Sequence, residues 1–288
     1  VVKYGFSTEQ EARERSKDAD VLILNKVQVN EQTIGEADHL KLVCVTATGT
    51  NNLDKEYLDK RGITWRNVAG YSTESVAQHT FAMLFYLLEK LPYYDNYVKS
   101  EKYVNDVSFT HFAKAFHEVS GMTYGIIGLG NIGRRVADIA KAFGCRVIYY
   151  STSGRNSQPG YERVSFDELL EQSDIVSIHA PLDENTLGLM NKEAFAKMKK
   201  SAILLNVGRG PIINEADLAE ALNNKTIAAA GLDVLSVEPM QEDNPLRGIK
   251  DSERLLITPH IAWAGVEARN RLMGIILGQI KEFFKAHE

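Results

Sequence analysis

The sequence predicts an α/β protein made of two lobes, each with a parallel sheet and helices on its faces. Short apolar runs alternate with helical patterns from residue 21 to about residue 65, and a second alternation begins at Met122. Such a βαβ rhythm is typical of parallel sheets. A long apolar helix and a segment without a clear period separate the two series, so we expect two lobes.

The first series follows from local patterns. Val1–Tyr4 is predicted as a strand or the end of one, and Ser7 with Gln10 has the form of a capping box that opens a polar helix to about Asp18. Apolar runs then predict strands, with helical or turn segments between them. The strands are Val21–Leu24, Leu42–Val45 and Ile63–Trp65, and the connecting segments are Glu31–Ala37 and Asp54–Arg61.

A long helix is predicted from Thr73 to about Leu91, where Pro92 should end it. It is apolar on more than one side, so we expect it to be buried between larger units. The polar and aromatic stretch Tyr93–Val119 has no clear period. It is either a domain crossing or an arm that packs on a partner subunit.

The second series is predicted in the same way. Ser165 with Glu168 caps one of its helices, and a helix from about Val266 to Lys285 closes the chain, with a return to the first lobe favoured. The predicted strands are Thr123–Ile127, Arg146–Tyr150, Asp174–Ile178, Ala202–Leu205, Ile227–Leu232 and Leu255–Ile257.

Composition limits the possible functions. The 288 residues are 44% hydrophobic and 25% charged, as in globular proteins, and the net charge of −5 argues against nucleic acid as a partner. No membrane-length apolar run or signal peptide is present, so we expect a cytoplasmic protein. Cys44 and Cys145 lie in apolar runs and are expected to be reduced core residues, with no metal site. The chain begins at Val1 without an initiating Met, which leaves open that residues precede it.

A glycine-rich turn indicates a dinucleotide. Gly128, Gly130 and Gly133, with Asn131 and Ile132 between them, match G-x-G-x-x-G directly after a strand and at the start of an amphipathic helix. The first glycine allows the tight turn, the second lets the backbone approach a pyrophosphate, and the third lets helix and strand pack closely. The motif alone is weak, but this context is the one that dinucleotide binding requires.

The end of the next strand leaves the choice of cofactor open. NAD-selective sites usually place Asp or Glu there to hold the ribose hydroxyls. This chain instead has Ser151, Thr152 and Arg155, with no acid between Tyr150 and Arg155. Hydroxyl groups and an arginine could accept a 2′-phosphate, although Arg155 could equally be a solvated loop residue. Both NAD and NADP remain possible.

Three reactive side chains each follow a strand-like run of the second series. Arg209 suits a carboxylate because its guanidinium donates two parallel hydrogen bonds, and His260 can exchange a proton near neutral pH with Glu238 as its partner. Taken singly, each has a simpler explanation. Arg209 could form a surface ion pair, Glu238 could be a loop carboxylate, and His260 could be a buried histidine with satisfied hydrogen bonds. Of the other histidines, His79 is interpreted as packing or polar lining. The rest have no partner at a meaningful spacing: His39, His111, His117 and His287.

The chain resembles the D-isomer-specific 2-hydroxyacid dehydrogenases over nearly its whole length. The segments that carry the resemblance are GIIGLGNIGRRVA, HAPLDENT, LLNVGRGPIINEADLAEAL, GLDVLSVEP and TPHIAWAGVEAR. The resemblance implies two Rossmann-like lobes, each with a doubly wound parallel sheet. They are a discontinuous, flavodoxin-like substrate lobe, here residues 1–93 with 264–288, and an NAD(P)-binding Rossmann lobe, residues 94–263. It also implies a homodimer joined through the cofactor lobe. Members usually begin with a strand and helix turn that precede Val1 here.

The resemblance also implies residue roles. Arg209 would bind the substrate carboxylate and carbonyl, His260 would be the acid–base, and Glu238 would be its partner. Asp233 would meet the nicotinamide amide and Thr186 would lie near the phosphates. Further residues would line the cofactor, namely His179, Ala180, Pro181, Val207 and Gly208, and others would bind or shape the substrate, namely Thr48, Gly49 and Trp263.

The implied function is hydride transfer between NAD(P)H and a small 2-oxo or D-2-hydroxy acid. The run NVAGYSTESVAQHT and Trp263 are most like the glycerate dehydrogenase or hydroxypyruvate reductase branch. Hydroxypyruvate/D-glycerate or glyoxylate/glycolate are therefore the expected pairs, but the sequence does not rank the acids. The alternative is a non-catalytic, dinucleotide-sensing binding protein, similar to corepressors on this fold.

Overall fold

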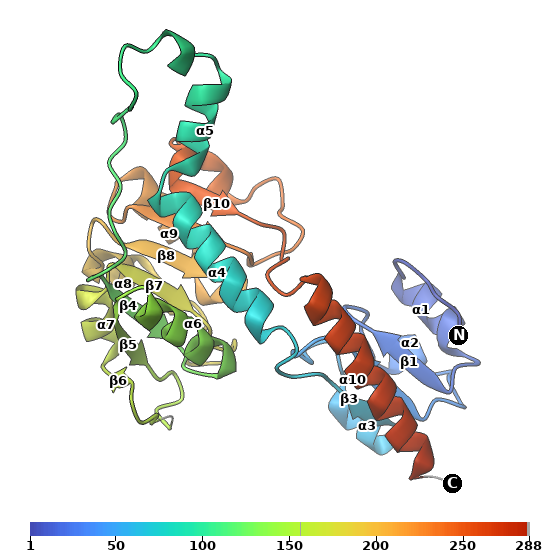
Figure 1. The fold of residues 1–288 in the computed structure, drawn as a ribbon. Coiled ribbons are helices and arrows are strands. Elements are labelled where there is room, and N and C mark those ends of the chain that lie inside the picture. The colour runs from blue at the N-terminus through green and yellow to red at the C-terminus, as the bar shows by residue number, and fades with distance from the viewer. Residues whose placement is uncertain (156, 287–288) are drawn as a thin grey trace. The chain divides into compact units, whose positions relative to one another are not determined.

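The computed structural model describes residues 1–155 and 157–286, and it divides into two compact units (Figure 1). The small unit comprises Val1–Ser72 and the chain from Ala264 onward, and the large unit comprises Thr73–Trp263. Both contain parallel sheets with helices, which confirms the predicted fold class. His287 lies outside the described residues.

The small unit has a three-stranded parallel sheet in the order β1-β2-β3. Its central strand is fully buried, and the last helix, α10, packs on that strand through a stripe of buried apolar residues. Helices α2 and α3 connect the strands. The elements are α1 (Glu9–Ser16), β1 (Val21–Leu24), α2 (Glu31–Ile34), β2 (Leu42–Val45), α3 (Lys55–Lys60), β3 (Thr64–Arg66) and α10 (Val266–Lys285).

The large unit has a seven-stranded parallel sheet in the order β10-β9-β8-β7-β4-β5-β6. The order reverses between β4 and β7, and the carboxyl ends of strands at such a switch point are where doubly wound sheets bind ligands. The strands are β4 (Thr123–Ile127), β5 (Arg146–Tyr150), β6 (Glu162–Arg163), β7 (Ile175–Ile178), β8 (Ile203–Asn206), β9 (Ala229–Leu232) and β10 (Leu255–Ile257).

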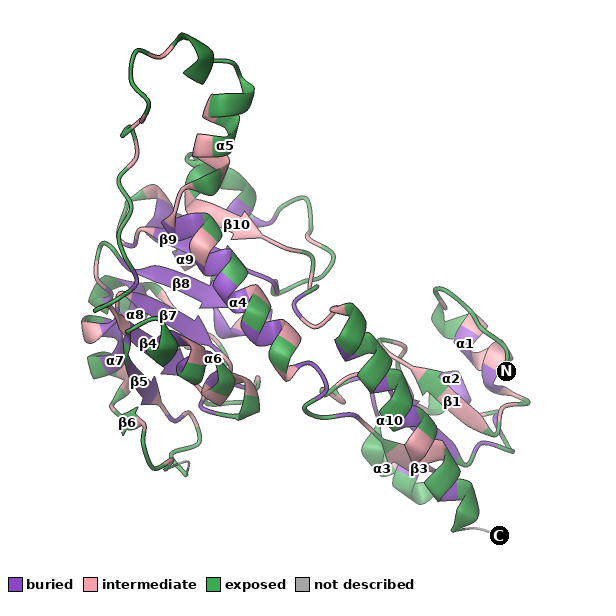
Figure 2. Ribbon diagram, viewed as in Figure 1, coloured by how far each residue is buried: buried purple, intermediate pink, exposed green. Residues whose placement is uncertain are grey.

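Helices cover both faces of this sheet. Apolar side chains of α4 and α6 form one buried cluster with the strands, and those of α7, α8 and α9 form another. The central strands are therefore buried on both faces (Figure 2). The helices are α4 (Thr73–Leu88), α5 (Leu91–Lys99), η1 (Tyr103–Asn105), α6 (Asn131–Ala142), α7 (Phe166–Gln172), α8 (Lys192–Lys197), η2 (Gly210–Ile212), α9 (Glu215–Asn223), η3 (Pro245–Gly248) and η4 (Ser252–Arg254).

The boundary between the units differs from the predicted one. The large unit begins at Thr73, whereas the sequence suggested that the first lobe extends to residue 93. Helix α4 is buried along most of its length because its apolar side chains pack on α6, β8 and β9. Its hydrophobic faces are therefore covered within the large unit.

Residues 91–118, here called the arm, contain a helix that the sequence did not predict. Helix α5 has no buried residue and carries Pro92 in its first turn, where the missing N–H costs no hydrogen bond. His111 in the arm has partners, contrary to expectation: its ring stacks on Tyr97 at 3.7 Å, and its Nε2 lies 2.9 Å from the Tyr93 hydroxyl. The arm is coloured mostly as exposed (Figure 2). Its exposed apolar side chains include Val107, Phe109 and Phe112.

Two predictions at the N-terminus are wrong. Val1–Tyr4 forms no strand, and its side chains are exposed. The first helix is capped by Thr8 rather than Ser7: the Thr8 hydroxyl accepts from the Glu11 N–H, and the Glu11 carboxylate accepts from the Thr8 N–H. The capping box is thus displaced by one residue from the predicted one.

Candidate active site

The three predicted reactive side chains follow three adjacent strands. Arg209 comes after β8, Glu238 lies in the loop after β9, and His260 comes after β10, and these strands are neighbours in the order β10-β9-β8. Parallel strands present their carboxyl ends at one sheet edge, so these loops emerge together there.

His260 and Glu238 form a hydrogen-bonded pair. Nδ1 of His260 lies 2.7 Å from Oε2 of Glu238, and the other carboxylate oxygen accepts from the Leu235 N–H at 3.1 Å. An ionised carboxylate only accepts hydrogen bonds, so Nδ1 carries a proton and Nε2 is the nitrogen that gains or loses one. The His260 side chain is 28% exposed, which leaves the ring open to small molecules.

A buried aspartate holds the loop that carries His260. Oδ1 of Asp233 accepts from the Thr258 hydroxyl at 2.6 Å and from the Ile261 N–H at 2.9 Å, and Oδ2 accepts from the Ala262 N–H at 2.8 Å. The backbone carbonyl of Asp233 also accepts from the His260 N–H at 2.8 Å. The backbone of His260 is left-handed, with φ of 55°, and these bonds support that conformation. Sequence reasoning assigned Asp233 only to the cofactor and missed this role.

The turn that carries Arg209 is fixed by a buried asparagine. Asn206 accepts from the Gly208 N–H and donates to the Arg209 carbonyl, both at 3.0 Å. Nη1 of Arg209 donates to the Gly208 carbonyl at 2.8 Å. Gly210 permits close packing on the loop after β9, because a Cβ there would lie 1.9 Å from the Leu235 carbonyl carbon. The Arg209 turn and the Glu238 loop are therefore packed against each other.

The glycine turn after β4 fits a dinucleotide pyrophosphate. Gly128 has φ of +91°, and a Cβ there would meet the Ala180 backbone at 2.8 Å, whereas a Cβ on Gly130 would meet nothing within 4 Å. Helix α6 begins at Asn131, and its N-cap, Gly130, supplies no side-chain hydrogen bond. The first N–H groups of a helix have no intrahelical acceptor and attract anions. The turn therefore offers both open space and backbone N–H donors for an anion at the switch point.

The loop after β7 is built from internal hydrogen bonds. Nε2 of His179 lies 2.9 Å from the Ser177 hydroxyl, and its Nδ1 is buried without a partner among the described residues. Burial lowers the pKa of His179 to about 3, so this ring is neutral at physiological pH. The buried hydroxyl of Thr186 donates to the Pro181 carbonyl at 2.8 Å and accepts from the Asp183 N–H at 2.8 Å. Thr186 thus stabilises the 181–186 turn.

The polar residues of the segment after β5 differ in their exposure to solvent. Ser151 is buried, Thr152 is half-buried and Arg155 is exposed. The Gly154 N–H donates to the Ser151 carbonyl at 3.1 Å, which closes a turn at the strand end. No carboxylate occurs between Tyr150 and Arg155, so nothing in this turn would repel a phosphate.

The remaining predicted residues, all proposed to bind or shape the substrate, lie in two loops. Thr48 and Gly49 belong to the small unit, in the loop after β2, where the Thr48 hydroxyl donates to the Val68 carbonyl at 3.1 Å. Trp263 is half-buried and is the last residue of the large unit.

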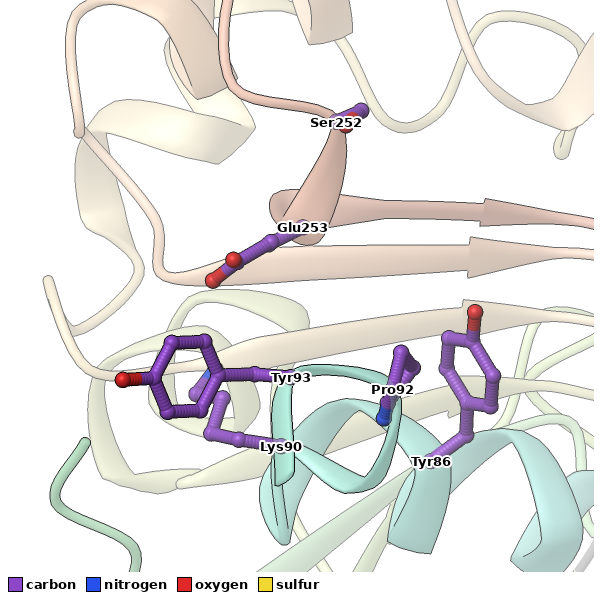
Figure 3. A pocket seen from close by; sticks show the side chains of 6 residues that line it. All are labelled: Tyr86, Lys90, Pro92, Tyr93, Ser252 and Glu253. Atoms are coloured by element: carbon purple, nitrogen blue, oxygen red, sulfur yellow. The ribbon is translucent and has the colours of Figure 1, made fainter. Parts of the chain in front are cut away.

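A separate cavity contains none of the predicted site residues. It lies between the start of α5 and η4 (Figure 3). Its volume of about 120 Å³ is small for a cofactor, since ligand pockets typically measure roughly 300–1,000 Å³. The lining residues are Tyr86, Lys90, Pro92, Tyr93, Ser252 and Glu253. Over residues 1–155 and 157–286, no group of acidic, His and Cys side chains could hold a metal, and no helix has the length and apolarity to span a membrane.

Comparison with known proteins finds the family that the sequence motifs resemble. The sequence model of the family described as D-isomer specific 2-hydroxyacid dehydrogenase, NAD binding domain, matches residues 81–262. The chain is 38% identical to a hydroxypyruvate reductase of Blautia hydrogenotrophica, over 96% of this chain and 85% of that protein.

Two solved structures are similar across most of both chains. One is an acyclic imino acid reductase in complex with NADPH and D-Arg, with a TM-score of 0.87, 30% identity and coverage of 99% of this chain and 89% of the other. The other is the D-lactate dehydrogenase of Aquifex aeolicus complexed with NAD and lactic acid, with a TM-score of 0.83, 28% identity and coverage of 95% and 85%.

Proposed function

Because the chain belongs to the D-isomer-specific 2-hydroxyacid dehydrogenases, we propose that it reduces a small 2-oxo acid to the D-2-hydroxy acid, with hydroxypyruvate or glyoxylate preferred. The chain is an NAD(P)-dependent oxidoreductase that acts on CH–OH groups. The observation that carries the proposal is the hydrogen-bonded pair of His260 and Glu238 at the sheet edge where the Arg209 turn also emerges.

His260 supplies the proton in this proposal. In the reducing direction, its protonated Nε2 donates to the oxygen that was the substrate carbonyl, while the C2 carbon gains a hydride. The strand ends of the large unit would hold a nicotinamide cofactor, which when bound would supply that hydride, or accept one in the reverse direction. Glu238 bonds Nδ1 at 2.7 Å, so it fixes the ring orientation and stabilises the imidazolium before the proton is transferred.

Arg209 orients the substrate. Its guanidinium would hold the carboxylate by two parallel hydrogen bonds and polarise the neighbouring carbonyl, which are positioning and electrostatic effects. Trp263, the last residue of the large unit, would shape the pocket for a small acid.

The cofactor would be held by the strand ends around the switch point. The α6 N-terminus, with Gly130, Asn131 and Ile132, would bind the pyrophosphate. Oδ2 of Asp233 accepts from the Ala262 N–H, and a carboxylate oxygen can accept a second hydrogen bond, so it would be the atom that meets the nicotinamide amide. The loops after β7 and β8 would contribute further contacts, from His179, Ala180, Pro181, Thr186, Val207 and Gly208.

Thr152→Asp is expected to weaken NADPH binding by about tenfold or more and to leave NADH binding unchanged or tighter. The new carboxylate would stand at the end of β5, where it repels a 2′-phosphate and can bond ribose hydroxyls. Fluorescence titration of both cofactors measures the effect, and Thr152→Asn is the uncharged control of the same shape. If Thr152→Asp changed the affinity for NADH and NADPH equally, the 2′ position of the bound cofactor would lie away from Thr152.

The arm is proposed as a homodimer interface that belongs to the large unit. Phe109 and Phe112 are 88% and 89% exposed, and large exposed apolar side chains gathered in one segment are typical of subunit contacts. Phe109→Glu with Phe112→Glu should raise the dimer dissociation constant by about 100-fold or more, because a two-fold interface contains each substitution twice. Light scattering over a dilution series measures this. Met273→Glu, at an exposed apolar position of α10, is the control that should stay dimeric.

A panel of 2-oxo acids, assayed with NADH and with NADPH, tests the proposed activity and ranks the substrates. We expect turnover with at least one small acid and the highest kcat/KM with hydroxypyruvate or glyoxylate. Cofactor binding without turnover over the whole panel would instead favour a dinucleotide-sensing protein.

A further inference from the structure

His79 occupies a position that the proposed chemistry does not use. It lies on α4 of the large unit, and its side chain is 21% exposed. Its Nε2 is 3.0 Å from the Thr258 hydroxyl oxygen and 3.6 Å from Oδ1 of Asp233. The sequence suggested only packing or a polar lining at this position.

The direction of these hydrogen bonds follows from the chemistry of the groups. The Thr258 hydroxyl has one hydrogen, and it donates that hydrogen to Oδ1 of Asp233 at 2.6 Å. Towards His79 it can then only accept, so Nε2 of His79 carries a proton. The result is a chain of donors from His79 through Thr258 to Asp233.

Asp233 in turn holds the loop that carries His260. The same carboxylate accepts from the Ile261 and Ala262 N–H groups, and its own carbonyl accepts from the His260 N–H. One turn earlier on α4, the Ser75 hydroxyl donates to the Ala262 carbonyl at 2.6 Å. Helix α4 thus bonds the loop on both sides of His260.

We propose that His79 is a positioning residue for His260, acting through the Thr258 hydroxyl and the Asp233 carboxylate. The inference rests on the proposed function, since it assigns His260 the proton transfer. Without the His79 donor, the Thr258 hydroxyl is free to rotate, and the carboxylate that holds the loop loses one fixed donor. Displacing a reacting group by about 1 Å can cost about 100-fold in rate.

The test is a double-mutant cycle between His79 and Thr258. His79→Leu removes the donor, and Thr258→Val replaces the hydroxyl by a methyl of similar size. Each should lower kcat by about 10- to 100-fold, and the double variant should lose no more than the worse single one, because both break one chain of hydrogen bonds. His79→Gln, whose Nε2 can still donate, should recover most of the activity.

A second readout does not depend on turnover. Amide hydrogen exchange should become faster at Ile261 and Ala262 in His79→Leu and stay slow in His79→Gln. Thr80→Val is the matched control: Thr80 is buried beside His79, but its hydroxyl donates to the Val76 carbonyl of its own helix. It should leave both kcat and loop exchange unchanged.

Several results would overturn the inference. They are wild-type kcat in His79→Leu, independent effects that multiply in the double variant, or no recovery with His79→Gln. If His79→Leu does not fold, Thr258→Val decides, because wild-type kcat and loop exchange in that variant also refute the inference. Full activity in His260→Asn would refute the proposed function itself, so the two failures are distinguishable.

Discussion

Replacing His260 by asparagine should lower kcat for 2-oxo acid reduction by about 10²- to 10⁴-fold, the usual contribution of a positioned general acid. Asparagine can still donate to Glu238 from the place of Nδ1, so the loop and its partner keep their hydrogen bond. It has no group in the place of Nε2, so the developing alkoxide receives its proton only from water. Steady-state rates at saturating substrate measure the loss.

Cofactor binding separates this effect from misfolding. The dissociation constants of NADH and NADPH for His260→Asn should match those of the wild-type protein. Glu238→Gln is the companion variant, since it keeps an acceptor for Nδ1 but removes the charge that stabilises the imidazolium. It should be less impaired than His260→Asn. A His260→Asn protein with undiminished kcat would remove the acid–base role.

Arg209→Leu should lower kcat/KM by about 100-fold. A hydrogen bond to a charged group contributes about 1.5–3 kcal/mol, and 1.36 kcal/mol corresponds to a factor of ten. Arg209→Lys should restore only part of the loss, because an ammonium group lacks the planar pair of donors that matches a carboxylate. Arg247→Gln, at an exposed arginine of the large unit, should leave kcat/KM unchanged.

A substrate analogue isolates the carboxylate contact. A 2-oxo amide lacks the charge that Arg209 is proposed to bind, so the wild-type protein should discriminate against it by about the factor lost in Arg209→Leu. The variant should show little further discrimination between acid and amide. Strong preference for the acid in Arg209→Leu would show that another residue binds the carboxylate.

The strands that could be predicted from the sequence are those whose apolar runs have sharp limits. β1, β2, β4, β5 and β10 have the predicted bounds, and so does α10, because its apolar stripe faces β2. Helix α5 was missed because Pro92 predicts the end of the preceding helix, whereas in the structure it stands in the first turn of α5, where proline is tolerated. The boundary at Thr73 depends on what α4 packs against, which is a tertiary property.

The sequence predicts which residues form the candidate site better than it predicts the hydrogen bonds that connect them. The spacing of Arg209, Glu238 and His260 after strand-like runs predicted their common sheet edge, and the structure adds the 2.7 Å bond between the last two. The part of Asp233 in holding the His260 loop was not predictable, because its donors come from a loop that only the fold brings close. His79 lies 179 positions from Thr258, so no spacing in the sequence relates them.

The most direct test of the account is the reaction of the purified protein with hydroxypyruvate and a reduced nicotinamide cofactor, followed by chiral analysis of the product. We predict that one D-glycerate forms for each NADH or NADPH consumed and that His260→Asn forms almost none. Formation of the L isomer, or no consumption of either cofactor with any small 2-oxo acid, would contradict the account.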